Sequence, residues 1–185
     1  HSKAYMQKLF KACGKVMMSI VEMPQPVIAR IHGIATAAGC QLVAMCDLAV
    51  AADGARFAVS GINVGLFCST PSVALGRAMG RKEAMEMLLT GDLIDARTAL
   101  AWGLVNRVVP GAELDAAVGA LATKIAAKSA AAVALGKRTF YAQVEEGIAD
   151  AYATAAETMA CNMLDPDAAE GVDAFLGKRA PQWRT

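Results

Sequence analysis

The sequence predicts an α/β fold in which a small sheet is followed by a helical C-terminal region. Residues 47–52 are almost all apolar, which is typical of a strand in a parallel sheet covered on both faces. Short apolar segments alternate with helical patterns up to Pro110, and only helical patterns follow. This change predicts a sheet-bearing core over residues 1–110 and a helical region over residues 111–185.

Each element has its own local signal. Residues 5–22 repeat apolar side chains at spacings of three and four, which predicts an amphipathic helix, and Pro24 and Pro26 end it. Residues 60–71 are rich in Gly, Asn and Ser and predict a long loop. The expected strands are 27–32, 47–52, 56–59 and 105–109. The expected helices are 35–45, 71–79, 82–89, 96–102, 113–128, 131–144, 148–163 and 166–176.

Two helix starts are signalled strongly. Asp95 is expected to be the N-cap of the helix over residues 96–102, and Gly103 ends that helix. Asp165 followed by Pro166 gives an N-cap and a proline at the first helical position.

The composition of the 185-residue chain excludes several function classes. Eighteen basic residues face 17 acidic ones without a charged block, so we expect no nucleic-acid partner. No apolar run reaches about 18 residues, so we expect no membrane span. The chain has 40 alanines and only 5% aromatic residues, which predicts a core of closely packed helices.

The five cysteines are odd in number and contain no CxxC pair, which favours buried thiols in a reduced, intracellular protein over a disulfide scaffold. We therefore expect a cytoplasmic protein. No metal site is expected. The N-terminal residues resemble neither an initiator methionine nor a targeting peptide, so the chain is expected to start within a longer protein.

Two segments are candidates for a functional site. Residues 33–40 join a strand to a helix through small side chains, so a ligand can approach the free N–H groups of a helix N-terminus. Such amides can stabilise an oxyanion. The loop over residues 61–71 is suited to lining a pocket. Ordinary helix–sheet packing and an ordinary loop explain the same residues equally well. His32 is interpreted as a structural residue, so a Ser-His-Asp triad is not supported.

These segments carry a resemblance to a known family. Residues 26–33 (PVIARIHG), residues 37–50 (AAGCQLVAMCDLAV) and residues 84–91 (AMEMLLTG) resemble the enoyl-CoA hydratase/isomerase (crotonase) superfamily. The resemblance continues through residues 99–105 and through Glu170, Phe175, Lys178 and Arg179. Residues 40–44 and 61–71 look most like the mitochondrial "enoyl-CoA hydratase domain-containing" subtype and its bacterial relatives, which implies a mitochondrial location if the source is a eukaryote.

The resemblance implies a crotonase-like ββα superhelix, lacking its N-terminal part here, with a C-terminal helical trimerisation region. It implies an acyl-CoA thioester as ligand, with coenzyme A as part of the substrate and no separate cofactor, and a homotrimer or dimer of trimers. Ala38 matches a residue whose backbone N–H binds the thioester carbonyl and stabilises its enolate, beside Ala37 and Gly39. Lys178 matches a basic residue that in relatives helps to hold the CoA phosphates of a neighbouring subunit's ligand, and Phe175 matches the wall of the same pocket.

The sequence departs from the family at two positions. The resemblance places the two glutamates of the hydratases at Gln41 and Gly61. Gln41 can orient water but does not exchange a proton, and Gly61 is expected to contribute only room. Each lost acid–base group typically costs about 10²–10⁴-fold in rate. Asn63, Phe67 and Cys68 remain as candidate substrate contacts. The family's other oxyanion N–H and its adenine-binding loop are implied upstream of Tyr5.

Three functions therefore remain open. The first is a hydratase/isomerase-type enzyme (a lyase by family) of fatty-acid or acyl-CoA metabolism, with an enolate-stabilising site. The second is a non-catalytic acyl-CoA-binding pseudoenzyme, which the residues at positions 41 and 61 favour. The third is a structural or assembly partner whose helical C-terminal region drives oligomerisation. The alanine-rich helices permit this function, but it does not explain why the loop over residues 61–71 matches the family.

Overall fold

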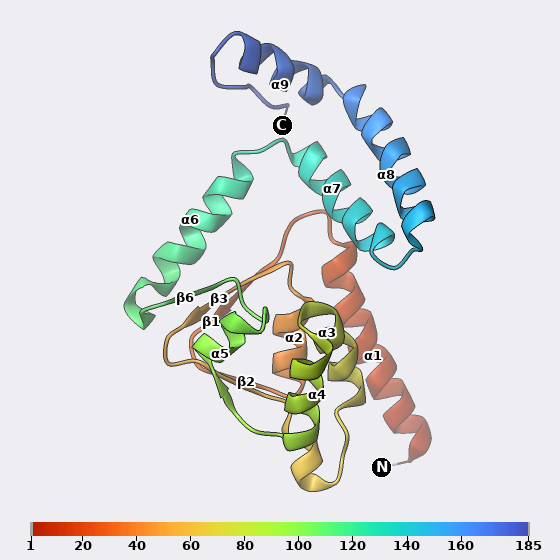
Figure 1. Ribbon diagram of the computed structural model, residues 1–185, viewed down its shortest axis with the longest axis vertical. Helices are drawn as coiled ribbons and strands as arrows, with labels where there is room; N and C mark the ends of the chain where they lie inside the picture. Colours follow the sequence, from red (N-terminus) through yellow and green to blue (C-terminus); the bar gives the residue numbers. More distant parts are fainter. Residues whose placement is uncertain (1, 185) are drawn as a thin grey trace. The chain divides into compact units, whose positions relative to one another are not determined.

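The computed structural model describes residues 2–184, which form two compact units (Figure 1). Unit 1 contains most of the N-terminal helix together with Val27–Leu121, and unit 2 contains Val21–Pro26 and the chain from Ala122 onward. The boundary between the two units therefore falls after Leu121, inside the helix Leu114–Ala126. The sequence pattern predicted a boundary at residue 110. The assignment of the C-terminal helices to oligomerisation stays a prediction.

Unit 1 holds two three-stranded sheets. In the first, β1 (Ile28–Ile31), β3 (Leu48–Ala52) and β6 (Arg107–Val109) are parallel, with β3 in the centre. In the second, β2 (Ile34–Thr36) and β5 (Ile94–Asp95) flank β4. The central strand β4 (Arg56–Ala58) runs parallel to β2 and antiparallel to β5.

Helices make up most of the rest of the described chain. The α-helices are α1 (Lys3–Glu22), α2 (Ala38–Met45), α3 (Ser69–Ala78), α4 (Arg81–Thr90), α5 (Ala96–Ala101), α6 (Leu114–Ala126), α7 (Ala130–Gln143), α8 (Ile148–Met163) and α9 (Pro166–Leu176). Two 3₁₀ turns are η1 (Ser60–Val64) and η2 (Gly111–Glu113). Within unit 1, α2 packs on α3, and within unit 2, α7 packs on α8 (Figure 1).

The predicted caps are confirmed. The Asp95 side chain accepts a 2.8 Å hydrogen bond from the Thr98 amide at the start of α5. The Asp165 side chain accepts a 2.8 Å bond from the Asp167 amide at the start of α9, with Pro166 at its first position.

Two predictions of secondary structure were wrong in detail. The helix expected from residue 35 begins at Ala38, because residues 34–36 pair with β4 as strand β2. These three residues, of which only Ala35 is buried, fit a half-exposed strand as well as a helix, so only the tertiary pairing decides between the two. The very short strand β5 had no signal of its own, and the predicted loop contains η1 and the start of α3.

The alanines fill the core differently from the expectation. Ala51, Ala55, Ala96 and Ala99 are fully buried, but Ala51 lies on the central strand β3 and Ala55 follows that strand. Alanine therefore brings strands and helices of unit 1 together, rather than helices alone. In unit 2, α7 and α8 contain no buried residue.

All five cysteines are free, with Cys40 buried and Cys161 exposed. Within residues 2–184, no single helix is long and apolar enough to cross a membrane. The two helical segments 111–126 and 130–143 are long and apolar enough only when they are taken together, and the chain bends by 102° between them.

The packing of β3 leads to a prediction about stability. Ala51 is fully buried, so Ala51→Leu should overpack the sheet and lower the free energy of unfolding by about 1–3 kcal/mol. The matched control is Ala12→Leu on the exposed face of α1, which should change it by less than about 0.5 kcal/mol. Urea unfolding measures both, and equal effects would contradict this description of the core.

Candidate functional site

The first turn of α2 is held by a strained residue. Ala37 has φ 47° and ψ −116°, a conformation that favours glycine. Its amide donates a 3.0 Å hydrogen bond to the Ala58 carbonyl, and its carbonyl accepts a 3.0 Å bond from the Gln41 amide. The helix start is thus tied to the end of β4 and to its own first turn.

This arrangement leaves the Ala38 amide available. Ala38 is the first residue of α2, and its N–H has no acceptor within the described part of the chain. Ala37, Ala38 and Gly39 are all exposed. An amide at a helix N-terminus also carries the positive end of the helix dipole, so it can bind a carbonyl oxygen on which negative charge develops.

Gln41 lies one turn further along α2 and is buried, with 4% of its surface exposed. Its Oε1 atom accepts a hydrogen bond from the Cys13 thiol of α1, at 3.8 Å between sulfur and oxygen. The sequence contained no signal for this partner, since Cys13 lies 28 residues away. The side chain is held by the protein and carries no exchangeable acid.

Gly61 does not provide the expected room. A Cβ atom at this position would lie 2.6 Å from the Leu66 carbonyl oxygen and 2.7 Å from the Cys68 sulfur. The Leu66 amide also donates a 2.9 Å hydrogen bond to the Gly61 carbonyl, which closes the loop on itself. The expectation of free space was wrong because glycine here permits a close approach of the loop's own backbone.

The other loop candidates differ in exposure and contacts. The Asn63 side-chain amide donates a 3.4 Å hydrogen bond to the Gly91 carbonyl at the end of α4, so it anchors the loop. Phe67 is exposed, and Cys68 packs partly against the core that contains Cys40. Burial, and to a lesser extent the neighbouring Cys68, raises the pKa of the Cys40 thiol to about 12, so this thiol stays protonated near neutral pH.

Phe175 and Lys178 belong to unit 2. Phe175, at the end of α9, leaves 82% of its surface exposed, and Lys178 follows with a positive φ of 50°. The Lys178 side chain is exposed and has no ion pair or hydrogen bond within residues 2–184. An exposed ammonium that no residue within 2–184 binds is suited to an anionic ligand.

Carboxylates of α9 hold the chain that follows. Glu170 forms a bidentate pair with Arg179, at 2.6 and 2.8 Å, and accepts a 2.7 Å bond from the Gln182 amide. These contacts, with Arg179 first, lower the pKa of Glu170 to about 2. The composition of the sequence did not reveal this pairing.

A second carboxylate of α9 is buried. Asp167 accepts a 2.5 Å hydrogen bond from the Ser129 hydroxyl and a 3.1 Å bond from the Arg184 amide. Ser129 is also the N-cap of α7. The Ser129 hydroxyl, followed by the Arg184 amide, holds the pKa of Asp167 below its usual value.

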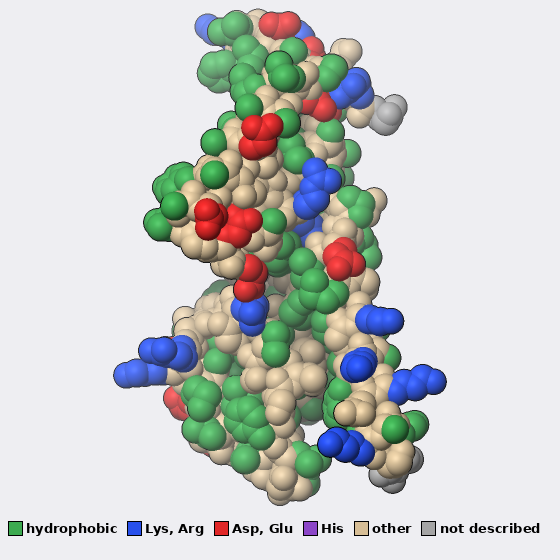
Figure 2. All heavy atoms as spheres, turned by 90° about the vertical axis from the view of Figure 1, so that its right-hand side faces the viewer, with side chains coloured by type: hydrophobic (Ala, Val, Ile, Leu, Met, Phe, Trp, Pro, Cys, Tyr) green, Lys and Arg blue, Asp and Glu red, His purple; other side chains and the backbone are tan. Residues whose placement is uncertain are grey.

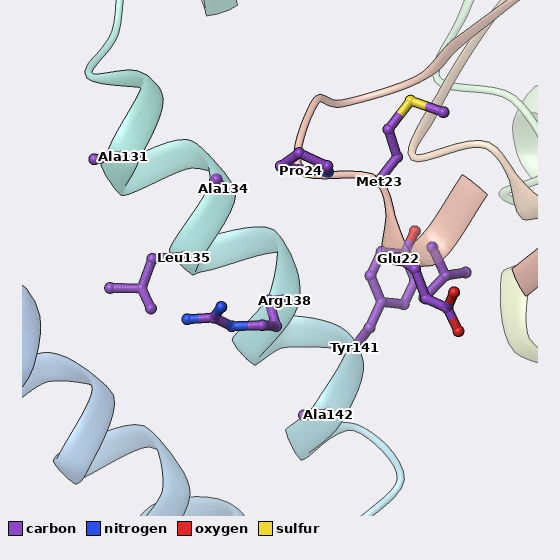
Figure 3. A pocket seen from close by; sticks show the side chains of 10 residues that line it. Glu22, Met23, Pro24, Ala131, Ala134, Leu135, Arg138, Tyr141 and Ala142 are labelled. Atoms are coloured by element: carbon purple, nitrogen blue, oxygen red, sulfur yellow. The ribbon is translucent and has the colours of Figure 1, made fainter. Parts of the chain in front are cut away.

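A hollow of about 470 Å³ lies in unit 2, between residues 21–24 and one side of α7 (Figure 3). Its lining is mainly apolar, with Glu22, Arg138 and Tyr141 as the polar members. It contains none of the residues expected at the site. Within residues 2–184 no three His, Cys, Asp or Glu side chains are arranged to hold a metal ion, and His32 is exposed rather than packed.

Comparisons with known proteins identify the class of protein that has this fold and this helix start. The family model described as enoyl-CoA hydratase/isomerase matches residues 2–185, and the chain belongs to that family. A crystal structure of an enoyl-CoA hydratase from Mycobacterium smegmatis superposes with a TM-score of 0.98 at 63% identity, covering 100% of this chain and 72% of that chain. The crotonase fold is therefore shown.

Several of the most similar relatives share a more specific name than that of the family. Enoyl-CoA hydratase domain-containing protein 3, mitochondrial, from Rattus norvegicus is 51% identical over 179 residues, covering 97% of this chain and 60% of the relative. The crystal structure of the human protein of that name has a TM-score of 0.95 at 52% identity, over 98% of this chain and 72% of that chain. This chain spans about 60% of the length of the curated relatives that it matches most strongly.

The closed loop around Gly61 leads to a prediction. Gly61→Ala should force the Leu66 carbonyl or the Cys68 side chain to move, which lowers the free energy of unfolding by about 1–3 kcal/mol. Gly33→Ala is the matched control, because nothing lies within 4 Å of a Cβ atom there. Thermal melting measures both, and a neutral Gly61→Ala variant would show that the loop is open.

The carboxylate of Glu170 leads to a second prediction. Because folding lowers its pKa from 4.5 to about 2, its contribution to stability is complete above pH 4.5 and is lost as the pH falls toward 2. The melting temperature should therefore fall over this range, and less steeply in Glu170→Gln. Circular dichroism between pH 6 and 2.5 measures the difference, and parallel curves for the two proteins would contradict this assignment.

Proposed function

We propose that the chain binds an acyl-CoA thioester and polarises its carbonyl through the Ala38 amide, in fatty-acid or acyl-CoA metabolism. The observation that carries this proposal is the unpaired, exposed Ala38 N–H at the start of α2, fixed by the strained residue Ala37. Charge that develops on the thioester oxygen is stabilised by this amide and by the helix dipole. Such charge develops when a nucleophile adds to the double bond of an enoyl thioester or a proton leaves its α-carbon; both steps give an enolate, which fits the family description of hydratase/isomerase.

The remaining proposed contacts follow from the shape of a CoA ester. Gly39 and Phe67 are exposed in unit 1 and suit contacts with the acyl part, as does Cys68, which follows Phe67 in the chain. In unit 2, Phe175 and Lys178 suit the CoA moiety of a ligand held by a neighbouring copy of the chain, because both side chains are exposed and no residue within 2–184 binds the Lys178 ammonium. Coenzyme A enters as part of the substrate, so no separate cofactor is proposed.

A second candidate is an acyl-CoA-binding protein without turnover. Two observations favour it: Gln41 accepts a hydrogen bond from Cys13, and position 61 has no space for a side chain. Neither position supplies a proton donor or acceptor of the kind that hydration requires. Binding through Ala38 is common to both candidates.

We also propose self-association through unit 2. Large apolar side chains lie exposed on its helices, including Ile148, Tyr152, Leu164 and Leu176, and Figure 2 shows that hydrophobic side chains reach the surface at many places. Exposed apolar area of this extent is typical of an interface. A homotrimer or a dimer of trimers is the expected assembly, and light scattering of the purified chain measures it.

A hydration assay separates the two candidates. If the chain is an enzyme, crotonyl-CoA is hydrated above the rate in water, and Gln41→Ala lowers kcat by at least about tenfold, because Gln41 orients the water. If turnover is unchanged in Gln41→Ala, Gln41 has no part in the mechanism. Binding of acetoacetyl-CoA without hydration would support the non-catalytic candidate.

The Ala38 amide can be tested with a ligand pair. Butyryl-CoA should bind about fivefold more tightly than its thioether analogue, S-butyl-CoA, because only the thioester has an oxygen to accept the hydrogen bond. Calorimetry measures both dissociation constants. Equal affinities would contradict the proposed contact, and no binding of either ligand at millimolar concentration would exclude the acyl-CoA proposal.

A further inference from the structure

The end of α9 has a geometry that glycine would ordinarily supply. The Lys178 amide donates to the Phe175 carbonyl at 3.2 Å, and the Arg179 amide donates to the Ala174 carbonyl at 3.0 Å. These two bonds define a Schellman motif, in which the residue in the left-handed conformation is most often glycine. Here that residue is Lys178, with φ 50°, although Gly177 is its neighbour. A strained backbone at a non-glycine residue points to a constraint that the surroundings maintain.

The surroundings that maintain it are visible. Glu170 lies two turns earlier on α9 and binds the Arg179 guanidinium through both carboxylate oxygens, at 2.6 and 2.8 Å. The Gln182 amide donates to the same carboxylate at 2.7 Å. The chain on both sides of Lys178 is therefore fixed, by α9 before it and by the Glu170 carboxylate after it.

The rest of the C-terminal tail, residues 179–184, is also attached within unit 2. The Trp183 indole N–H donates to the Ala127 carbonyl at 2.9 Å, and its ring lies against Gly171. Arg184 pairs with Asp165 and Asp167. Through these contacts the tail packs back against α9. The Lys178 side chain, at the turn between α9 and the tail, is bound by no described residue.

We propose that Glu170 and Arg179 are positioning residues that hold the Lys178 backbone, so that its side chain leaves a fixed turn toward the phosphates of a CoA ester. This inference rests on the proposed function, in which Lys178 contacts those phosphates. A flexible lysine must be ordered when it binds, and prior fixation of its backbone reduces that cost. The bidentate geometry requires arginine, since lysine at position 179 would supply a single point charge.

Calorimetry on the full chain tests this with two probes, acetoacetyl-CoA and acetoacetyl-pantetheine, which has the same thioester but no phosphate. Glu170→Gln should weaken acetoacetyl-CoA binding by about two- to tenfold, the range for ordering one side chain, and leave acetoacetyl-pantetheine unchanged. Arg179→Lys should fall between wild type and Arg179→Ala. In a Lys178→Ala background, Glu170→Gln should have no further effect. The matched control is Arg184→Gln, which removes other pairs of the same tail and should not change either affinity.

The outcomes separate this inference from the proposed function. If Lys178→Ala weakens acetoacetyl-CoA binding and Glu170→Gln does not, the positioning role is overturned and the phosphate contact stands. If Glu170→Gln weakens both probes equally, its effect is general and the positioning role is again overturned. If Lys178→Ala has no effect on either probe, the phosphate contact itself fails.

A measurement without ligand tests the structural half of the inference. Hydrogen exchange of the Lys178 and Arg179 amides, which the α9 carbonyls protect, should be about tenfold faster in Glu170→Gln and unchanged in Arg184→Gln. Unchanged exchange in Glu170→Gln would overturn the claim that this carboxylate fixes the turn.

Discussion

The hydrogen bond from the Ala37 amide to the Ala58 carbonyl connects the two halves of the candidate site. It extends the pairing of β2 with β4 by one residue, beyond Thr36 and Ala58. On one side the chain enters α2 and presents the Ala38 amide, and on the other it enters the turn around Gly61. The register of one short parallel pair therefore brings a helix start and a glycine loop together. The strain at Ala37 is maintained by that register.

The residues around this bond bear on the chemistry that we propose. In unit 1 the proposed amide donor is exposed, whereas the two positions to which the resemblance assigns the glutamates of the hydratases hold a buried amide and a glycine without room for a side chain. The loop has closed into the space that a longer residue at position 61 would occupy. The proposed oxyanion site is compatible with these residues because it is made of backbone, whereas proton transfer depends on side chains.

Much of the fold could be predicted because it depends on local signals. The caps at Asp95 and Asp165 and the apolar strand around Val50 are properties of neighbouring residues, and the structure confirms them. The strand β2 could not be predicted, because its small residues suit a helix or a strand and only pairing with β4 decides. The site followed a similar pattern. The segment 33–40 could be selected from its place at a strand–helix junction, and Ala38 within it only from the family resemblance. The Cys13–Gln41 contact and the closed loop depend on residues far apart in the sequence or on exact backbone approach.

The side-chain contacts of unit 2 were the hardest part of the structure to predict from the sequence. Its helices were predicted from periodicity, but the buried Asp167 and the paired Glu170 act through residues of the C-terminal tail. Charged residues near a chain end carry little information about partners, because exposed and paired carboxylates look alike in sequence. The structure places a strained, unpaired lysine at the centre of this network.

The most direct test of the central claim is the infrared spectrum of a bound thioester whose carbonyl carbon is ¹³C. A hydrogen bond from the Ala38 amide, with the α2 dipole behind it, polarises the C=O bond and lowers its stretching frequency. The account predicts a shift to lower frequency when [¹³C]butyryl-CoA binds, relative to the ligand in water. A bound ligand whose carbonyl frequency is unchanged or raised would contradict the claim that this backbone amide receives the thioester oxygen.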